Sequence, residues 1–386
     1  MIVIGGIMGT AANGYTIIGF FWMLTVARGV TGFGTGGEYP AASTSASEAA
    51  NEKRLSQRGP IFILVTNLPL SFGNPLVISI FLIVLSAAGS NHLSIVWRVC
   101  FGIGILLPLS VFYFRLKMLN SKLYRRGAIK HRVPYRLVIR YYWKTLIGTC
   151  GAWFLYDFVT FPNGIFSGTI IASVIPDPTI KKTAEWTLLL ASLSIPGVLI
   201  GAWLCNKIGR KYTMMLGFSG YLIFGLIVGC AYDQLTKIIP LFIIFYGLMT
   251  SSGNLGPGDM LGLLSSECYA TAVRGTCYGI SAALGKVGAA VGTQAFKPIA
   301  DNLGQRWTFI IAAICGVAGI LVTYFFIPNI SGADLAEGDE KFRQYLVANG
   351  WDGIMGEDDL KALADNGIRD ALEVAGKRDS IVGIKT

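Results

Sequence analysis

Five charged residues stand inside long apolar segments of the chain: Arg28, Glu38, Asp157, Asp259 and Lys286. In the hydrocarbon core of a membrane such a charge costs about 3 kcal/mol, and charges kept there usually bind substrate, transfer protons or pair with one another. Arg28 and Glu38 are ten positions apart, which is about 15 Å along a helix. They cannot pair with each other, so each needs another partner or a water-filled cavity.

The segment GAWFLYDFVTFPNG, residues 151–164, carries one of these carboxylates. Trp153, Asp157 and Phe161 are spaced four residues apart and therefore share one face of a helix. No cation stands near Asp157 in the sequence, and burial favours the neutral form of a carboxyl group. We expect Asp157 to take up and release a proton. Pro162 and the glycine two positions later predict a break in the helix at the depth of the substrate. For Trp153, the alternative to a substrate contact is packing against lipid or the core.

Lys286 lies in the middle of the apolar segment 275–297 and is flanked by glycines. A compact cation at this place is the expected partner of a phosphate anion or of Asp157, and a purely structural ion pair is the alternative. The amide of Asn254 can donate hydrogen bonds to phosphate oxygens without adding charge. Asp259, about one turn later, is a second carboxylate that we expect to take part in proton coupling.

The run GFGTGGEYP, residues 32–40, combines glycines with Glu38 and Tyr39. Glycines of this kind are expected to let a helix pack backbone to backbone against its neighbours. We expect Tyr39 to contact the substrate and Glu38 to titrate or to act in gating. The alternative for Glu38 is a structural ion pair on the cytoplasmic side.

The composition indicates that these residues belong to a membrane protein. The chain has 53% hydrophobic and 14% charged residues, against about 25% charged residues in soluble domains. Apolar runs of the length that crosses a hydrocarbon core alternate with short charged stretches, so we predict an all-α membrane protein. Ten candidate spans follow: 1–12, which is too short to cross alone, 16–41, 60–87, 93–114, 145–175, 184–204, 212–231, 238–263, 275–297 and 307–328.

Several other classes are disfavoured. The seven cysteines have no paired or metal-like spacing, and the two histidines, His92 and His131, fall in loops. We therefore expect neither an intramembrane hydrolase nor a metal site or cofactor. The N-terminus has no basic region and no cleavage site, so it is not a signal peptide. The net charge of +10 is not interleaved with aromatic residues, and we expect no nucleic-acid binding.

The loop charges predict the orientation and the domains. Residues 115–144 contain ten Lys/Arg and no Asp/Glu, so by the positive-inside rule this loop is cytoplasmic. It separates an incomplete N-terminal helical bundle, residues 1–114, from a C-terminal six-helix bundle, residues 145–329. The tail, residues 330–386, has a net charge of −5 and is expected to be cytoplasmic. Within it FRQYLVANGWDG could form a short amphipathic helix, but a solvated tail is the favoured interpretation.

Four stretches of this sequence resemble the major facilitator superfamily. The run from Arg28 to Pro40 is similar to its fourth span, and GGEYP resembles the corresponding motif of the phosphate:proton symporters. The loop AWLCNKIGRK, residues 202–211, is similar to the signature loop of the superfamily, with Asn206 in place of its aspartate. SSECYATAVRG (265–275) and GISAALGKVGA (279–289) resemble the tenth-span loop and the eleventh span. The whole is similar to the fungal permeases for glycerophosphoinositol and glycerophosphocholine.

The resemblance implies about ten spans of an expected twelve. Residues 1–12 would end the third span, so the chain would be a fragment that lacks spans one and two. The resemblance implies that Tyr39 and Trp153 lie where the phosphate symporters place their substrate groups. We expect Asn254 and Lys286, from their residue types, to bind substrate as well. The resemblance further implies that Arg28, Asn206, Arg210, Lys211, Glu267 and Arg274 act in gating or structure.

The sequence therefore predicts a proton-coupled importer of an organic phosphate in a multi-pass membrane protein, expected in the plasma membrane. Phe161 replaces a tyrosine of the symporters, and Pro69 and Leu70 stand where a glutamine is expected. Fewer polar donors favour a monoanionic phosphodiester over inorganic phosphate. The alternatives are an inorganic phosphate:proton symporter, a nutrient sensor with the transporter fold, and an inactive truncated protein. The expected partners are protons, this small molecule and the lipid bilayer.

Overall fold

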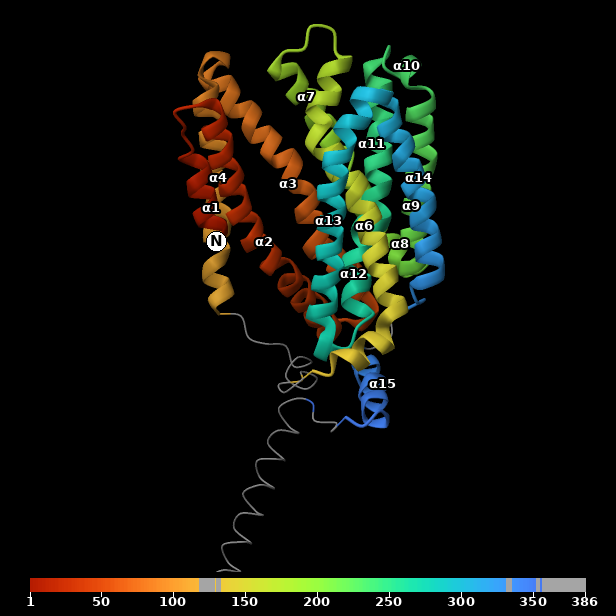
Figure 1. Cartoon of the computed structure of the whole chain (residues 1–386). Helices are drawn as coiled ribbons and strands as arrows, with labels where there is room; N and C mark the ends of the chain where they lie inside the picture. Colours follow the sequence, from red (N-terminus) through yellow and green to blue (C-terminus); the bar gives the residue numbers. More distant parts are fainter. Residues whose placement is uncertain (118–128, 130–132, 331–334, 352–354, 356–386) are drawn as a thin grey trace, which may run out of the picture.

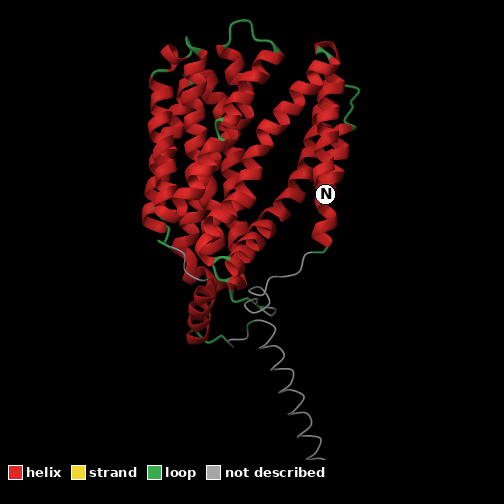
Figure 2. Cartoon of the chain, turned by 180° about the vertical axis from the view of Figure 1, so that it is seen from behind, coloured by secondary structure: helices red, strands yellow, loops and turns green. Residues whose placement is uncertain are grey.

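A computed structural model describes residues 1–117, 129, 133–330, 335–351 and 355. All regular elements in these ranges are helical (Figure 2). The N-terminal group consists of α1 (Ile2–Thr10), α2 (Ile17–Lys53), the 3-10 turn Leu55–Gln57, α3 (Arg58–Ala88), the 3-10 turn Ser90–His92 and α4 (Leu93–Leu116). The C-terminal group consists of α6 (Tyr135–Val174), α7 (Ile180–Ser192), α8 (Ile195–Lys207), α9 (Arg210–Cys230), α10 (Tyr232–Leu235), α11 (Ile239–Gly253), a π-helical turn (Asn254–Gly258), α12 (Asp259–Glu267), α13 (Thr271–Leu303) and α14 (Arg306–Phe326). Helix α15 (Leu335–Ala348) follows.

The prediction of an all-α membrane bundle is confirmed. Each of the ten predicted spans contains helix, with the span 184–204 divided between α7 and α8 and the span 238–263 divided between α11 and α12. In the described part of the chain, seven helical stretches are long and apolar enough to cross a membrane. Their outer surfaces carry exposed Leu, Ile, Val and Phe side chains, as expected of helices that contact lipid.

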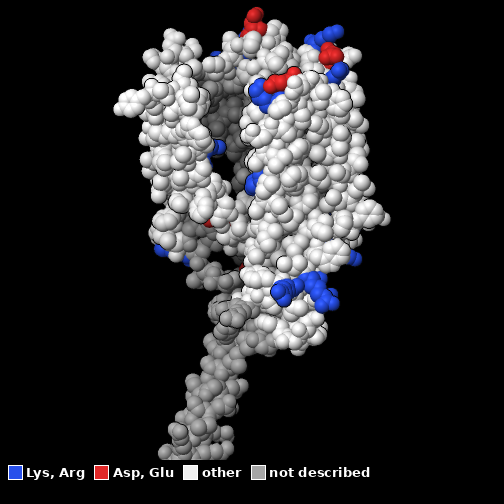
Figure 3. Space-filling view, viewed as in Figure 1, with Lys and Arg blue, Asp and Glu red and all other residues white. Residues whose placement is uncertain are grey.

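The two groups form a V that is closed at one end (Figure 1). Helices α2 and α3 run obliquely and meet α12 and α13 at the end of the molecule where α15 lies. At the opposite end the groups separate, and the space-filling view shows a hollow between them with basic side chains on its walls (Figure 3). The cavity is therefore open at the end opposite α15 and closed at the end where α15 lies.

Two glycines set sharp turns on the C-terminal side. Gly209 joins α8 to α9 with φ 88°, and Gly304 ends α13 with φ 96°. These values lie in the left-handed region that side chains other than glycine rarely adopt. The turns return the chain directly into the next helix, so that α8 packs beside α9 and α13 beside α14.

The predicted helix break at Pro162 is wrong. Helix α6 is continuous for 40 residues, and it begins at Tyr135, within the segment expected to be a basic loop. A proline removes one backbone donor, but neighbouring helices can compensate for this loss. Asn163 donates to the carbonyl of Val159 (2.8 Å), and Tyr246 donates to the carbonyl of Asn163 (2.9 Å). These two bonds flank Pro162, and α6 continues past it while packed against α13.

The favoured interpretation of the tail is also wrong in its first part. Helix α15 is docked: Phe342 and Leu346 are fully buried, and Phe342 packs against Tyr141 and Tyr142 of α6. The carboxylate of Asp339 accepts hydrogen bonds from the backbone N–H and the hydroxyl of Thr271, both at 2.6 Å. Burial raises the pKa of Asp339, while these two hydrogen bonds act in the opposite direction. The carboxylate thereby caps the first turn of α13.

Candidate substrate site and gate

The two mid-helix charges of the C-terminal group form an ion pair. Lys286 Nζ of α13 lies 2.9 Å from Asp157 Oδ2 of α6. Asp157 is 2% exposed, whereas the lysine side chain is 48% exposed. Asp157 has no cation near it in the sequence, but the packing of α6 against α13 brings Lys286, 129 residues away, next to it. The buried carboxylate therefore orients a cation that an anion in the cavity can reach.

Aromatic side chains surround this pair. Lys286 Nζ lies 4.3 Å from the ring centroid of Phe161 and 5.6 Å from that of Tyr39. Trp153 and Tyr278 pack edge to face at 5.4 Å, and Tyr39 lies 6.2 Å from each of them. Tyr39 belongs to α2 and the others to α6 and α13, so both halves contribute to the cluster.

Glycines of α13 allow this close approach. A Cβ added at Gly285 would overlap the Trp153 ring, and one added at Gly288 or Gly292 would overlap the backbone of α6. The sequence thus places small residues at positions 285, 288 and 292, on one face of α13, and the helix backbones meet there. Any side chain at these positions would push Lys286 away from Asp157.

The glycines of α2 behave differently from the prediction. Added Cβ atoms at Gly29, Gly32, Gly36 and Gly37 would meet nothing within 4 Å, and only Gly34 contacts a neighbour, α1. The predicted backbone-to-backbone packing of α2 is therefore wrong at four of five positions. Arg28 and Glu38 are exposed on the same helix.

Asn254 occupies a separate polar group at the π-helical turn. Its Oδ1 accepts a hydrogen bond from Tyr156 (3.1 Å), and its Nδ2 donates to the carbonyl of Ser194 (3.3 Å). Tyr156 is adjacent to Asp157 in α6. The structure therefore links Asn254 to the Asp157 region through Tyr156 rather than placing it against Lys286.

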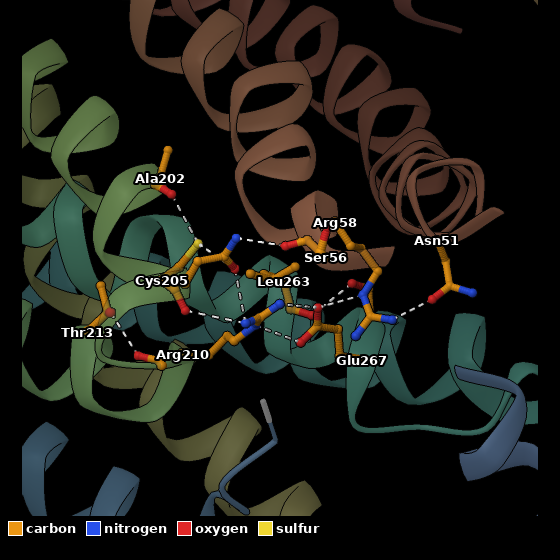
Figure 4. A network of polar contacts seen from close by, with 12 residues as sticks. Asn51, Ser56, Arg58, Ala202, Cys205, Arg210, Thr213, Leu263 and Glu267 are labelled. Atoms are coloured by element: carbon orange, nitrogen blue, oxygen red, sulfur yellow. Dashed lines mark hydrogen bonds and ion pairs between the residues drawn. The ribbon is translucent and has the colours of Figure 1, made fainter. Parts of the chain in front are cut away.

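A buried ion cluster closes the end near α15 (Figure 4). Glu267 of α12 receives Arg58 Nε of α3 at 2.8 Å on one oxygen and Arg210 Nε of α9 at 3.2 Å on the other. All three side chains are at most 4% exposed. Asn206 accepts from Arg210 Nη1 (3.2 Å) and donates to the carbonyl of Ser56 (2.9 Å). We call Arg58, Asn206, Arg210 and Glu267 the latch, because it joins the two halves.

A second contact between the halves lies beside the latch. Arg274 Nη1 of α13 is 2.7 Å from Glu48 Oε1 of α2, and the hydroxyl groups of Tyr278 and Ser43 are 2.9 Å apart. Lys211, expected to act with Arg210, instead donates to the carbonyl of Tyr324 in α14 (2.7 Å). That contact lies within the C-terminal group, so Lys211 does not join the halves.

Sequence reasoning missed Arg58, Glu48, Asn67 and Tyr278 as site residues. Arg58 lies just outside the predicted span 60–87, and Glu48 lies beyond the predicted end of its span at residue 41. Helix α2 continues twelve residues further, to Lys53. A buried cation such as Arg58 is indicated in sequence only by its position just before a long apolar run.

We expect Glu267→Gln to open the latch. The amide leaves two buried guanidinium groups without their counter-charge, and breaking a buried pair costs about 3–5 kcal/mol. The closed conformation should lose most of its population. Cross-linking between the native Cys205 and a cysteine placed at Gly59, whose added Cβ would lie 2.9 Å from Cys205 Sγ, should fall at least about tenfold in this variant. As a control, Glu337→Gln removes an exposed ion pair on α15 and should leave cross-linking unchanged. Equal cross-linking in both variants would contradict the latch.

Comparison with known proteins agrees with this geometry. The family model described as "Sugar (and other) transporter" matches residues 1–132 and 126–342. The glycerophosphoinositol permease 1 of Candida albicans is 59% identical over 374 residues, which cover 95% of this chain and 72% of that protein. The glycerophosphoinositol transporter 1 of Saccharomyces cerevisiae is 58% identical, over 93% of this chain and 70% of that protein.

The fold is similar to that of a solved transporter. The proton:xylose symporter XylE of the major facilitator superfamily, bound to 6-bromo-6-deoxy-D-glucose, superimposes with a TM-score of 0.72 at 16% sequence identity. The match covers 88% of this chain and 81% of XylE. At this identity it shows the fold alone. With the family match and the two permeases, the conclusion is that this chain belongs to the sugar (and other) transporter family of the major facilitator superfamily, in the branch that contains the fungal glycerophosphoinositol permeases.

Proposed function

We propose that the protein imports a glycerophosphodiester, such as glycerophosphoinositol or glycerophosphocholine, together with a proton. The observation that carries the proposal is the Lys286–Asp157 pair, in which an exposed cation is held by a buried carboxylate beside aromatic side chains. The activities for which the two similar permeases are named support the same substrate class.

The ion pair supplies a coupling mechanism. While Asp157 is ionised, it neutralises Lys286 and competes with an incoming anion. A proton on Asp157 removes this competition, and Lys286 can then bind the single negative charge of a phosphodiester. Substrate and proton therefore favour each other's binding, as linkage requires. The pair carries the same net charge with both ligands bound as with neither.

The shape of the site favours an organic substrate. Phe161 and Tyr39 lie near the lysine as apolar and amphipathic surfaces, and the buried rings of Trp153 and Tyr278 support Tyr39. Aromatic faces bind the carbon skeleton of a polyol or the cationic headgroup of choline. Inorganic phosphate offers no surface that such faces would recognise.

The described conformation corresponds to one half of an alternating-access cycle. The latch and the Glu48–Arg274 pair close the end near α15, and the hollow opens at the other end (Figure 3). The basic segments adjoin the closed end, so the positive-inside rule assigns that end to the cytoplasm. We propose that the protein lies in the plasma membrane with this orientation.

Uptake into proteoliposomes tests the proposal. Purified protein is given labelled glycerophosphoinositol, glycerophosphocholine or inorganic phosphate, with the outside acidic and then with a protonophore added. We expect saturable accumulation of at least one glycerophosphodiester, collapsed by the protonophore. Preferred accumulation of inorganic phosphate would replace the proposal by the phosphate symporter alternative. Binding without accumulation would favour a sensor.

A further inference from the structure

A second carboxylate, outside the Lys286 pair, is buried where the two halves meet. Asp259, the first residue of α12, is 1% exposed. Its Oδ1 accepts a hydrogen bond from Asn67 Nδ2 of α3 at 3.2 Å, and the same amide donates to the carbonyl of Gly258 at 3.1 Å. Its Oδ2 is buried and has no hydrogen-bond partner among the described residues. The amide of Asn67 therefore binds the only oxygen of this carboxyl group that has a partner.

No cation of the described chain pairs with Asp259. The latch cations Arg58 and Arg210 are bound to Glu267. From α3 the group facing Asp259 is the neutral amide of Asn67. From α8 the titratable group is the buried thiol of Cys205, and from α6 the hydroxyl of Tyr156 lies beside Gly258. An ionised carboxylate with one neutral donor is strongly disfavoured in such a place, so the group holds a proton here.

The surrounding backbone is shaped around this carboxyl group. A Cβ added at Gly201 of α8 would overlap both Asp259 Oδ2 and the carbonyl oxygen of Leu255. The π-helical turn Asn254–Gly258, which contains Pro257, directly precedes Asp259. Such turns disrupt the regular backbone bonding and occur frequently at functional sites. The backbone before Asp259 is therefore not a regular α-helix, and the glycine at position 201 leaves room for the carboxyl group.

The Asn67 contact depends on closure of the halves. Asn67 follows Arg58 by nine residues on α3, and Asp259 precedes Glu267 by eight residues on α12. The Asn67–Asp259 contact therefore lies about 12 Å deeper than the Arg58–Glu267 contact, between the same two helices. A separation of α3 from α12 that breaks the latch must also remove Asn67 from Asp259 and admit water to it.

We infer that Asp259 is a second proton-binding group of the transport cycle, which holds a proton while the α15 end is closed and releases it when α3 and α12 separate and water reaches the carboxyl group. The step converts the neutral carboxylic acid and water into a carboxylate and a hydronium ion. This inference rests on the proposed proton-coupled transport. It adds a release site near the closed end to the Lys286–Asp157 pair in the cavity.

Infrared spectroscopy tests the protonation without using transport. The difference spectrum of the unaltered protein minus Asp259→Asn, recorded at neutral pH, should contain the carbonyl band of one protonated carboxyl group, with a shift in heavy water. The band should persist when both proteins also carry Asp157→Asn. Absence of the band would overturn the inference whether or not the protein transports glycerophosphodiesters.

Flux measurements test the release step. We expect Asp259→Asn to keep counterflow of labelled substrate and to lower the number of protons moved per substrate by one. The exposed carboxylate Asp301, paired with Lys297, supplies the control variant Asp301→Asn, in which the ratio should not change. An unchanged ratio in Asp259→Asn, or an equal loss of counterflow and net uptake, would assign Asp259 a structural role and overturn the inference.

Discussion

The variant Asp157→Asn is expected to lose much of its uphill uptake while it keeps counterflow. Asparagine has the shape of the protonated acid and can leave Lys286 free for the substrate, but it cannot release a proton. One proton moving down one pH unit supplies about 1.4 kcal/mol, enough for about tenfold accumulation. Because Asp259 still carries its own proton, we expect the accumulation ratio of the variant to fall about tenfold in a gradient of one pH unit. The measurement is labelled glycerophosphoinositol in proteoliposomes, with and without a pH gradient.

Asp301→Asn is the matched control, because it removes a carboxylate of the same helical group from an exposed position. It should accumulate substrate like the unaltered protein. Accumulation in Asp157→Asn equal to that of the unaltered protein would remove this carboxylate from the coupling mechanism.

Loss of the Lys286 cation is expected to weaken substrate binding. Hydrogen bonds to charged groups contribute about 1.5–3 kcal/mol, so the dissociation constant of a glycerophosphodiester should rise roughly tenfold to a hundredfold in Lys286→Ala. Lys286→Arg keeps the positive charge and should retain part of the affinity, although its planar fork fits the site differently. Equilibrium binding to the detergent-solubilised protein is the measurement.

Destabilisation must be separated from lost binding in this case. Lys286→Ala leaves Asp157 as a buried charge without its partner, which is strongly destabilising. The double variant Lys286→Ala/Asp157→Asn removes both charges and should recover thermal stability without recovering affinity. Recovery of substrate affinity in the double variant would show that the lysine only balances the carboxylate.

The helices could be predicted from the sequence because apolar length is a local property. The spans were located correctly, but their ends were not. Helix α2 extends to Lys53 and α6 begins at Tyr135. Both helices include polar and charged residues beyond the apolar runs, and apolar length does not predict these extensions. The error at Pro162 has a similar origin, because the packing around α6 at this proline, including the contact of Tyr246 with Asn163, comes from distant parts of the chain.

The candidate site was predictable as a set of residues but not as a set of contacts. A charged residue inside an apolar segment can be recognised from the sequence alone, as Asp157, Asp259 and Lys286 were. Which charge meets which depends on helix packing: Lys286 reaches Asp157, whereas Asp259 meets the neutral amide of Asn67. A neutral partner such as Asn67 has no charge that would be unfavourable in the hydrocarbon core. The sequence therefore does not distinguish it from other polar residues.

The unbroken helix α6 has a consequence for α15. Tyr141 and Tyr142, which support α15, and Asp157, which holds Lys286, belong to one continuous helix and are about 24 Å apart along it. Displacement of that helix at one end displaces the other. A protein that binds α15 more tightly in one conformation must therefore change the affinity for the transported molecule, and substrate must change the affinity for that protein by the same factor.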